Sequence, residues 1–231
     1  MLKIINLLFT SGKKFKSDMR VQQYGLDYYR VGEEDLELIR YWRNQDFIRL
    51  TMQFSEYITP KMQKDWFHKI NNPLNYYFII NYKNKKIGLI NCKNTDIDSR
   101  IAEGGIFIWD ENFFGTPIPV LASLTMMESV FEVFQSGDAS IVTVRKDNSR
   151  AIVYNKNLGY KYYCESEDGS CVKLILRREE YFQLKNKIGR ALKIFIGEKN
   201  QFKISGSPSV TQDSVINKFF EKNNFSNSYS D

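Results

Sequence analysis

Runs of β-branched and aromatic residues alternate with helical patterns from Leu26 to Leu176, and this order limits the fold more than any other feature. Strands are expected at Leu26–Val31, Tyr76–Tyr82, Lys86–Cys92, Ile101–Trp109, Ser140–Val144, Tyr160–Cys164 and Cys171–Leu176. The spacing of apolar residues predicts helices at Leu36–Asn44, Thr59–Ile70, Val120–Phe134 and Asn148–Asn157. This order predicts an α/β fold with helices on the faces of one mixed sheet.

The ends of the expected helices carry residues that helix termini favour. Thr59 is a typical N-cap, and Pro60 follows it at the first helical position. Asn148 is suited to cap the later helix and Gly159 to end it. The boundaries of these two helices are therefore predicted to within a residue or two.

The excess of basic residues lies at the two ends of the chain. Of 231 residues, 33 are Lys or Arg and 27 are Asp or Glu, a net charge of +6. Residues 1–23 hold five basic groups and one acid. Residues 177–231 hold ten basic groups and six acids. Residues 24–176 hold eighteen basic groups and twenty acids, a net charge of −2. A central nucleic-acid groove is disfavoured, and no nucleic-acid partner is expected.

Length and composition suit one domain with extensions. The chain is 42% hydrophobic and 15% aromatic, enough to bury a sizeable core. The expected parts are a basic N-terminal arm (1–23), the α/β domain (24–177), a basic amphipathic helical extension (178–204) and a disordered tail (205–231). Leu184, Ile188, Leu192 and Phe195 form the apolar stripe of that extension.

The flanks have two interpretations. They pack against the domain, or they make a weak contact with a membrane surface or an acidic protein through their lysines. No apolar run approaches the roughly 20 residues of a membrane span. Met1–Phe9 does not have the order of a signal peptide, so a cytoplasmic location is expected.

Cysteine and histidine usage excludes several classes of site. Cys92, Cys164 and Cys171 are odd in number and lack metal-type spacing, so neither a disulfide framework nor a metal site is expected. His68 is the only histidine, and a Ser-His-Asp or Cys-His enzyme would depend on it alone. A surface or packing role suits His68 better.

Three segments, with the order of elements, resemble the GNAT N-acetyltransferases. The resemblance covers Leu26 to Leu176 and is strongest to the branch of ribosomal-protein N-terminal and nucleotide-amino-sugar acetyltransferases. The segments are the first helix, which ends in Trp42-Arg43-Asn44, the strands Tyr77–Ile90 leading into Ala102–Ile108, and Asp147–Tyr160 with its D-N-x-x-A-I-x-x-Y-x-K-x-G-Y pattern. The resemblance implies the GNAT fold, a twisted, mostly antiparallel sheet flanked by helices.

The resemblance also implies acetyl-CoA as the acetyl donor, with no metal. In the family, the extended arm of the cofactor pairs with a splayed strand, here Gly105, Ile106, Phe107 and Ile108. Tyr154 matches the tyrosine near the CoA sulfur, which can act as a general acid. Asn148 matches the residue that binds the pantetheine amides. The alternatives are packing for Tyr154 and helix capping for Asn148.

One segment departs from the family. The family has Gln/Arg-x-x-Gly-x-Gly/Ala at the start of its third helix, where backbone N–H groups hold the pyrophosphate. Here Pro117 and Pro119 replace the two glycines, and each removes an N–H donor. Gly115, Thr116, Ile118 and Val120 keep theirs. The pyrophosphate is therefore expected to be bound more weakly or differently.

The acceptor side is less defined. Glu103, just before the cofactor strand, is the candidate base or amine-orienting residue, and a solvated strand-end carboxylate is the alternative. Arg43 and Asn44 are candidate acceptor contacts, since Arg43 can pair with a phosphate. The alternative is a structural corner closed by hydrogen bonds.

The function expected from the resemblance is transfer of acetyl from acetyl-CoA to a small-molecule primary amine. The branch favours a nucleotide-linked amino sugar in surface-glycan biosynthesis. The alternatives are a protein N-terminal acetyltransferase and a degenerate, non-catalytic domain that acts as a binding module.

Overall fold

The computed structural model describes residues 18–72, 74–96, 98–197 and 201–206, which build one nine-stranded sheet. The spatial order is β7-β8-β6-β5-β4-β3-β2-β1-β9, and only the β5–β6 pair is parallel. The strands are β1 Arg20–Gln23, β2 Leu26–Arg30, β3 Tyr76–Tyr82, β4 Lys85–Asp96, β5 Ile101–Ile108, β6 Ala139–Arg145, β7 Lys161–Glu165, β8 Cys171–Arg177 and β9 Lys203–Ser205. The prediction of a mixed, mostly antiparallel sheet is confirmed.

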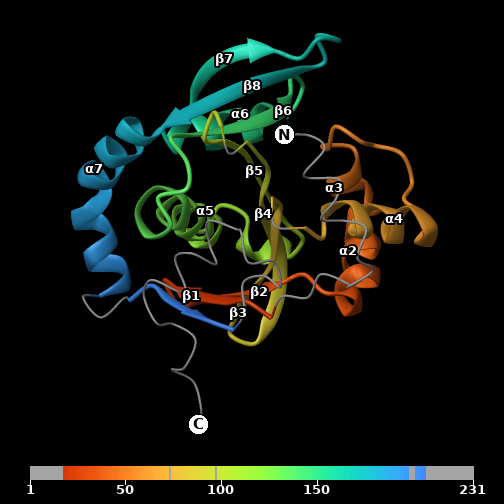
Figure 1. Cartoon of the computed structure of the whole chain (residues 1–231), viewed down its shortest axis with the longest axis horizontal. Coiled ribbons are helices and arrows are strands. Elements are labelled where there is room, and N and C mark those ends of the chain that lie inside the picture. Colours follow the sequence, from red (N-terminus) through yellow and green to blue (C-terminus); the bar gives the residue numbers. More distant parts are fainter. Residues whose placement is uncertain (1–17, 73, 97, 198–200, 207–231) are drawn as a thin grey trace.

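Helices cover the sheet on both sides (Figure 1). They are α2 Leu36–Arg43, α3 Asp46–Arg49, α4 Pro60–Ile70, α5 Ile118–Glu128, α6 Ser149–Asn157 and α7 Arg178–Ile196. A π-helical turn, Ser129–Val133, continues α5, and short 3-10 turns lie at Glu33–Asp35 and Glu111–Phe113. The single long helix expected at Val120–Phe134 is thus an α-helix followed by a π-turn.

Three buried clusters hold these layers together. One lies between α5 and the central strands and includes Phe78, Ile80 and Ala122. A second joins α2 and α4 to the opposite face through Ile39, Phe67 and Ile79. The third lies under the β6–β8 end of the sheet. Burial of this apolar surface is the main favourable term in folding.

The predicted helix ends are confirmed at atomic level. Thr59 Oγ1 accepts a hydrogen bond from the N–H of Met62 at 3.2 Å. Asn148 Oδ1 accepts one from the N–H of Ala151 at 3.1 Å. Gly159 follows α6 with φ of +88°, a conformation that glycine adopts without steric cost.

Both flanks contribute to the sheet, which sequence analysis did not predict. Arg20–Gln23, assigned from sequence to the arm, forms β1 and pairs with β2. Lys203–Ser205, assigned to the extension and tail, forms β9 and pairs with β1. Both strands are too short for a periodic pattern, so their pairing depends on tertiary contacts. The rest of the predicted arm (1–17) and tail (207–231) lies outside the described residues.

The predicted C-terminal helix is confirmed as α7, and it packs on the domain. Leu184, Ile188 and Leu192 contact the third cluster. The Tyr181 hydroxyl donates a hydrogen bond to Glu132, and Lys185 Nζ forms an ion pair with the same carboxylate at 2.5 Å. Lys185 is therefore already paired within the protein. In the part of the chain that the structure describes, every helix is too short or too polar to cross a membrane.

Candidate functional site

The sheet opens between β5 and β6. These parallel strands pair over only three residues, from Ile101–Ala139 to Glu103–Ile141. Beyond that point β5 continues against β4 through Gly104–Ile108, while β6 continues against β8. Among the described residues, one edge of each strand is thereby left without a partner strand. Such an edge can pair with an extended ligand, as an added strand would.

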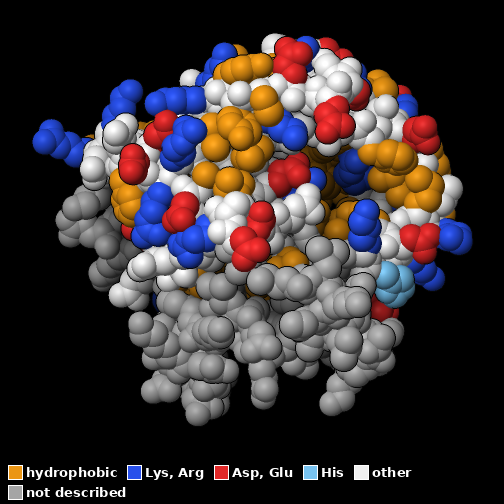
Figure 2. Space-filling model, turned by 45° about the horizontal axis from the view of Figure 1, so that its top comes forward, with side chains coloured by type: hydrophobic (Ala, Val, Ile, Leu, Met, Phe, Trp, Pro, Cys, Tyr) orange, Lys and Arg blue, Asp and Glu red, His pale blue; other side chains and the backbone are white. Residues whose placement is uncertain are grey.

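A cleft of about 990 Å³ occupies this opening. Ten of the twelve predicted site residues line it: Arg43, Glu103, Gly105, Ile106, Phe107, Ile108, Gly115, Thr116, Asn148 and Tyr154. Figure 2 shows a hollow in the surface that is bordered by hydrophobic and charged side chains. The structure thus brings together residues from four separate parts of the chain.

The charged side chains of the cleft are mostly basic. Among the described residues that line it, one acid, Glu103, faces four basic groups: Arg43, Lys93, Arg145 and Arg150. Lys93 Nζ lies 3.1 Å from Glu103, and Arg145 is paired with Asp147. Arg43 and Arg150 have no carboxylate partner within the described part of the chain. This distribution favours an anionic ligand, although the central domain as a whole is slightly acidic.

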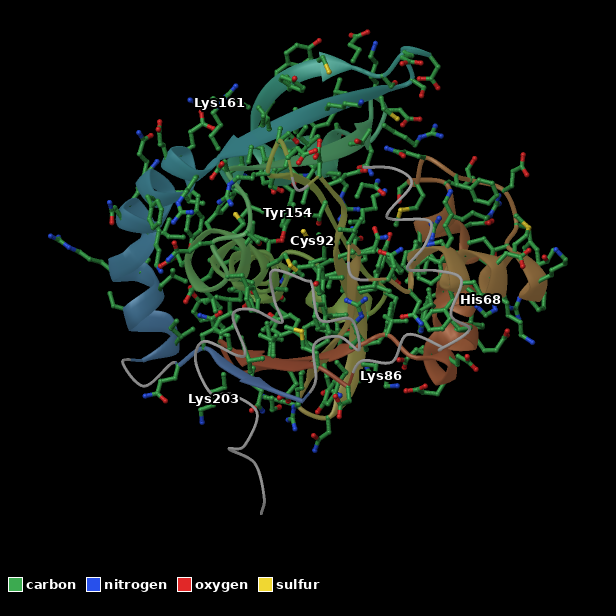
Figure 3. All side chains as sticks on the ribbon, in the orientation of Figure 1. His68, Lys86, Cys92, Tyr154, Lys161 and Lys203 are labelled. Carbon is green, nitrogen blue, oxygen red and sulfur yellow. The ribbon has the colours of Figure 1, made fainter. Side chains whose placement is uncertain are left out.

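Tyr154 lies on α6 near the centre of the molecule (Figure 3). Its hydroxyl donates a hydrogen bond to the carbonyl oxygen of Pro119 at 2.8 Å and lies 2.8 Å from Ser123 Oγ. Burial raises the pKa of Tyr154 above its usual value. The phenol is therefore protonated at neutral pH, and its single proton points to the Pro119 carbonyl oxygen in the cleft lining.

Asn148 serves as the α6 N-cap and also bridges the cleft. Its Nδ2 group donates to the carbonyl oxygen of Thr51 at 3.3 Å, which joins α6 to the segment after α3. Phe47 on α3 makes a second bridge, with its ring 6.5 Å from that of Phe114. The α3 segment therefore lies beside the opening between β5 and β6.

Gly105 faces Asn91 on β4, and the two residues are directly opposite in the ladder. A Cβ atom on Gly105 would lie 2.8 Å from Asn91 Oδ1, so a larger residue there would displace the Asn91 amide. Asn91 is 8% exposed, and its Nδ2 atom has no partner among the described residues. The amide of Asn91 therefore lines the cleft beside the predicted cofactor strand.

The segment before α5 keeps few free N–H groups. The N–H of Thr116 donates to Phe113 O at 3.2 Å, and that of Ile118 donates to Thr116 Oγ1 at 3.3 Å. Ile118 is 8% exposed and packs in the first cluster outside the cleft lining. Its predicted role as a phosphate donor is therefore not supported by its position.

Glu103 and the two residues at the end of α2, Arg43 and Asn44, all form hydrogen bonds within the protein, and Glu103 and Arg43 also line the cleft. Glu103 accepts a hydrogen bond from Asn94 Nδ2 at 3.2 Å, in addition to its ion pair with Lys93. Asn44 exchanges two hydrogen bonds with the backbone of Ile58, at 2.8 and 2.9 Å, and does not line the cleft. For Asn44 the corner interpretation fits. Arg43 instead lines the cleft.

Histidine and cysteine take no visible part in this site. His68 is exposed on the outer side of α4, well away from Tyr154 (Figure 3). Cys92 lines the cleft, but burial raises its pKa to about 11, so it is a thiol at neutral pH. In the described ranges, the structure shows no group of three His, Cys, Asp or Glu residues that could hold a metal ion.

Sequence analysis missed several polar residues of the cleft, among them Asn91, Ser123 and Arg150. Asn91 and Ser123 lie inside an ordinary strand and an apolar helix, where nothing in the sequence marks them. Arg150 stands two residues after the predicted cap Asn148. Its position in the first turn of α6 was a usable signal, because a cation is unfavourable near a helix N-terminus.

Comparisons with known proteins give matches at the level of structure. No family profile and no curated protein matches the sequence. FdhC, a nucleotide-linked sugar GNAT, superposes with a TM-score of 0.60 at 21% identity, over 75% of this chain and 98% of that one. Spermidine N-acetyltransferase from Vibrio cholerae, in complex with CoA and spermine, superposes with a TM-score of 0.59 at 16% identity, over 68% of this chain and 98% of that one. An uncharacterized protein from Bacillus halodurans superposes with a TM-score of 0.62 at 11% identity, over 72% of this chain and 91% of that one.

These likenesses show the fold. The chain has the GNAT fold, as its motifs predicted. In this chain the cleft lies where β5 and β6 separate.

Proposed function

We propose that this protein transfers an acetyl group from acetyl-CoA to the primary amine of a small molecule, and that the acceptor is a nucleotide-linked amino sugar. One observation carries the acceptor class. Arg43 lies partly buried in the cleft with no carboxylate partner among the described residues.

The donor is supported by the shape and charge of the cleft. Acetyl-CoA supplies a thioester on a long, flexible arm that ends in phosphates. The unpaired edge of β5, Gly104–Ile108, offers backbone groups to the amides of such an arm. Arg150, a basic side chain of the lining without a carboxylate partner among the described residues, suits its phosphates.

Tyr154 supplies the proton that the reaction needs at sulfur. The amine nitrogen bonds to the thioester carbon while the carbon–sulfur bond breaks and the sulfur takes up the electron pair. The phenol carries its proton at neutral pH and can donate it to that sulfur once the hydroxyl turns away from the Pro119 carbonyl. Ser123 Oγ, 2.8 Å from the phenol oxygen, can stabilise the phenolate that remains.

The acceptor contact rests on Arg43. Its Nη2 atom donates to Phe54 O at 3.3 Å, whereas Nη1 is buried without a partner among the described residues. Burial also lowers the pKa of this guanidinium, because the charged form loses contact with water. A phosphate or carboxylate of the acceptor would supply the missing charge and pair with both nitrogens.

Glu103 remains the candidate for orienting the acceptor amine. The amine of an amino sugar, next to electron-withdrawing oxygens, loses its proton more easily than a lysine amine. A strong base is then unnecessary, and a carboxylate already paired with Lys93 is sufficient to hold the amine. The proton leaves to solvent through the open cleft.

One observation favours a second acceptor class, a cationic amine such as a polyamine or a basic peptide N-terminus. A smaller cavity of about 530 Å³ shares Glu103 and Gln53 with the cleft and is lined by Asp96, Asp168 and a single lysine, Lys173. Hydrogen bonds from Ser166 and Ser170 lower the pKa of Asp168 to about 2, so this rim is anionic.

The test is release of CoA thiol by the full chain with acetyl-CoA and three acceptors: UDP-glucosamine, spermidine and a lysine-rich peptide. The proposed function predicts turnover of UDP-glucosamine well above that of free glucosamine, because only the former carries phosphates for Arg43. A preference for spermidine or the peptide would show that the acceptor is a cationic amine.

A binding control separates these outcomes from an inactive domain. Thermal unfolding is measured with and without millimolar acetyl-CoA, which must stabilise a protein that binds it in the folded state. An unchanged melting temperature would rule out the acetyltransferase assignment and favour the degenerate binding module.

A further inference from the structure

Arg150 is the second basic residue of the cleft without a carboxylate partner in the described residues. It stands in the first turn of α6, and its guanidinium lies 5.7 Å from the centre of the Phe114 ring. Phe114 directly precedes Gly115, and both line the cleft together with Arg150. The charge is thus held at the rim, beside the start of α5.

The position of Arg150 is electrostatically unfavourable in the protein alone. The N-terminal turn of a helix carries partial positive charge, which repels a cation placed there. Arg145, the neighbouring cation of the cleft, is neutralised by Asp147. No acid does the same for Arg150 within the described ranges. A bound anion would remove this repulsion.

The backbone at the start of α5 cannot serve as the usual phosphate cradle. Pro117 and Pro119 have no N–H, and the N–H groups of Thr116 and Ile118 are engaged with Phe113 and Thr116. Only Gly115 and Val120 lack a hydrogen bond within the described part of this segment. Two N–H groups are few for a diphosphate, so side chains must supply most of the contacts.

We infer that Arg150 binds the diphosphate of the CoA donor, in place of the backbone N–H groups that the two prolines remove. The inference rests on the proposed use of acetyl-CoA. A guanidinium held over an aromatic ring keeps its planar donor edge free, and that edge pairs with two phosphate oxygens at once. Phosphate recognition has passed from the backbone of α5 to a side chain of α6.

The experiment measures the dissociation constants of CoA, dephospho-CoA and pantetheine by calorimetry, for the full chain and for Arg150→Ala. Dephospho-CoA keeps the diphosphate but lacks the 3′-phosphate, and pantetheine has no phosphate. The variant should bind CoA and dephospho-CoA about tenfold more weakly, because one charge-assisted contact is lost. Its affinity for pantetheine should equal that of the wild type. Arg150→Lys should recover part of the loss.

Lys156→Ala is the matched control, since it removes an exposed cation from the last turn of the same helix. It should leave all three affinities unchanged. Equal CoA binding by wild type and Arg150→Ala would overturn the role of Arg150, as would a loss confined to CoA, which would indicate the 3′-phosphate. A wild-type chain that binds none of the three would instead overturn the proposed function itself.

Discussion

The phenol of Tyr154 donates a hydrogen bond to the carbonyl oxygen of Pro119, with 2.8 Å between the two oxygens. The short contact of the same phenol with Ser123 Oγ must then be donated by the serine, because a phenol has one proton. Pro119 is also one of the two prolines that replace glycines of the family pattern. The candidate acid and the altered phosphate segment are thus joined by one hydrogen bond.

Tyr154→Phe should lower turnover by about a hundredfold or more and leave the affinity for acetyl-CoA nearly unchanged. General acid catalysis contributes typically 10²–10⁴-fold, and the ring itself remains to fill its site. Steady-state kinetics of CoA release and calorimetry with CoA measure the two quantities separately.

Tyr160→Phe is the control for this substitution. Tyr160 is buried, and its hydroxyl shares a hydrogen bond with Ser140 Oγ at 2.9 Å. Both variants lose a buried hydroxyl and should lose about 1 kcal/mol of stability. Only Tyr154→Phe should lose turnover. Equal turnover in the two variants would remove Tyr154 from the chemistry.

The fold was predictable because its elements carry local signals. The capping residues Thr59 and Asn148 were placed correctly, since the N-cap preference depends on neighbouring backbone N–H groups. The strands β1 and β9 were not, because three or four residues carry no period. β9 pairs with β1 across more than 180 positions of the chain, whereas β1 and β2 form a local hairpin.

Many residues that line the cleft were predictable from the sequence, but their hydrogen bonds and ion pairs were not. Tyr154 and Gly105 were found through the family resemblance, and the cleft includes both. The bonds of Asn44 to Ile58 and of Glu103 to Lys93 depend on side chains that meet only in the folded chain. Arg150 drew no attention because a lone arginine on a helix is common at protein surfaces.

Arg43→Ala should raise the KM for a phosphate-bearing acceptor about tenfold and leave the KM for acetyl-CoA unchanged. The guanidinium is assigned to the acceptor, and a contact to a charged group contributes about 1.5–3 kcal/mol. The measurement compares UDP-glucosamine with glucosamine for each variant. The variant should lose most of the preference for the phosphorylated acceptor.

Arg49→Ala controls for a nearby loss of positive charge. Arg49 is paired with Asp46 and also donates to Ser55 O, so its charge is already compensated. It should retain the preference for UDP-glucosamine. A larger loss in Arg49→Ala than in Arg43→Ala would contradict the assignment of Arg43 to the acceptor.

Stability should fall steeply above pH 10. Burial raises the pKa of Tyr160 to about 12 and that of Tyr77 to about 12, against 10.0 for the free side chain. The unfolded chain therefore loses these protons first. The stabilising contribution is complete below pH 10 and is lost as the pH rises from 10 to 12, by up to about 1.4 kcal/mol per pH unit for each tyrosine.

Urea unfolding between pH 8 and pH 11 measures this slope. Tyr160→Phe should make the decline above pH 10 shallower, because one titrating group is gone, and should leave the slope between pH 8 and 9 unchanged. Parallel curves for the wild type and Tyr160→Phe above pH 10 would show that Tyr160 titrates normally in the folded protein.

Gly88→Ala should destabilise the fold by about 2–3 kcal/mol. A Cβ atom at Gly88 would lie 2.7 Å from the carbonyl oxygen of Phe107 and 2.7 Å from Ile108 Cδ1. The first of these atoms is backbone of β5, so the strand that lines the cleft must move, and overpacking costs about 1–3 kcal/mol. Gly104→Ala is the comparison, because its nearest atom, Ser140 Oγ, is 3.3 Å away at the end of a side chain. Urea unfolding of both variants should show the larger loss for Gly88→Ala, and a larger loss for Gly104→Ala would mean that β5 yields at Phe107 more readily than the contact distances indicate.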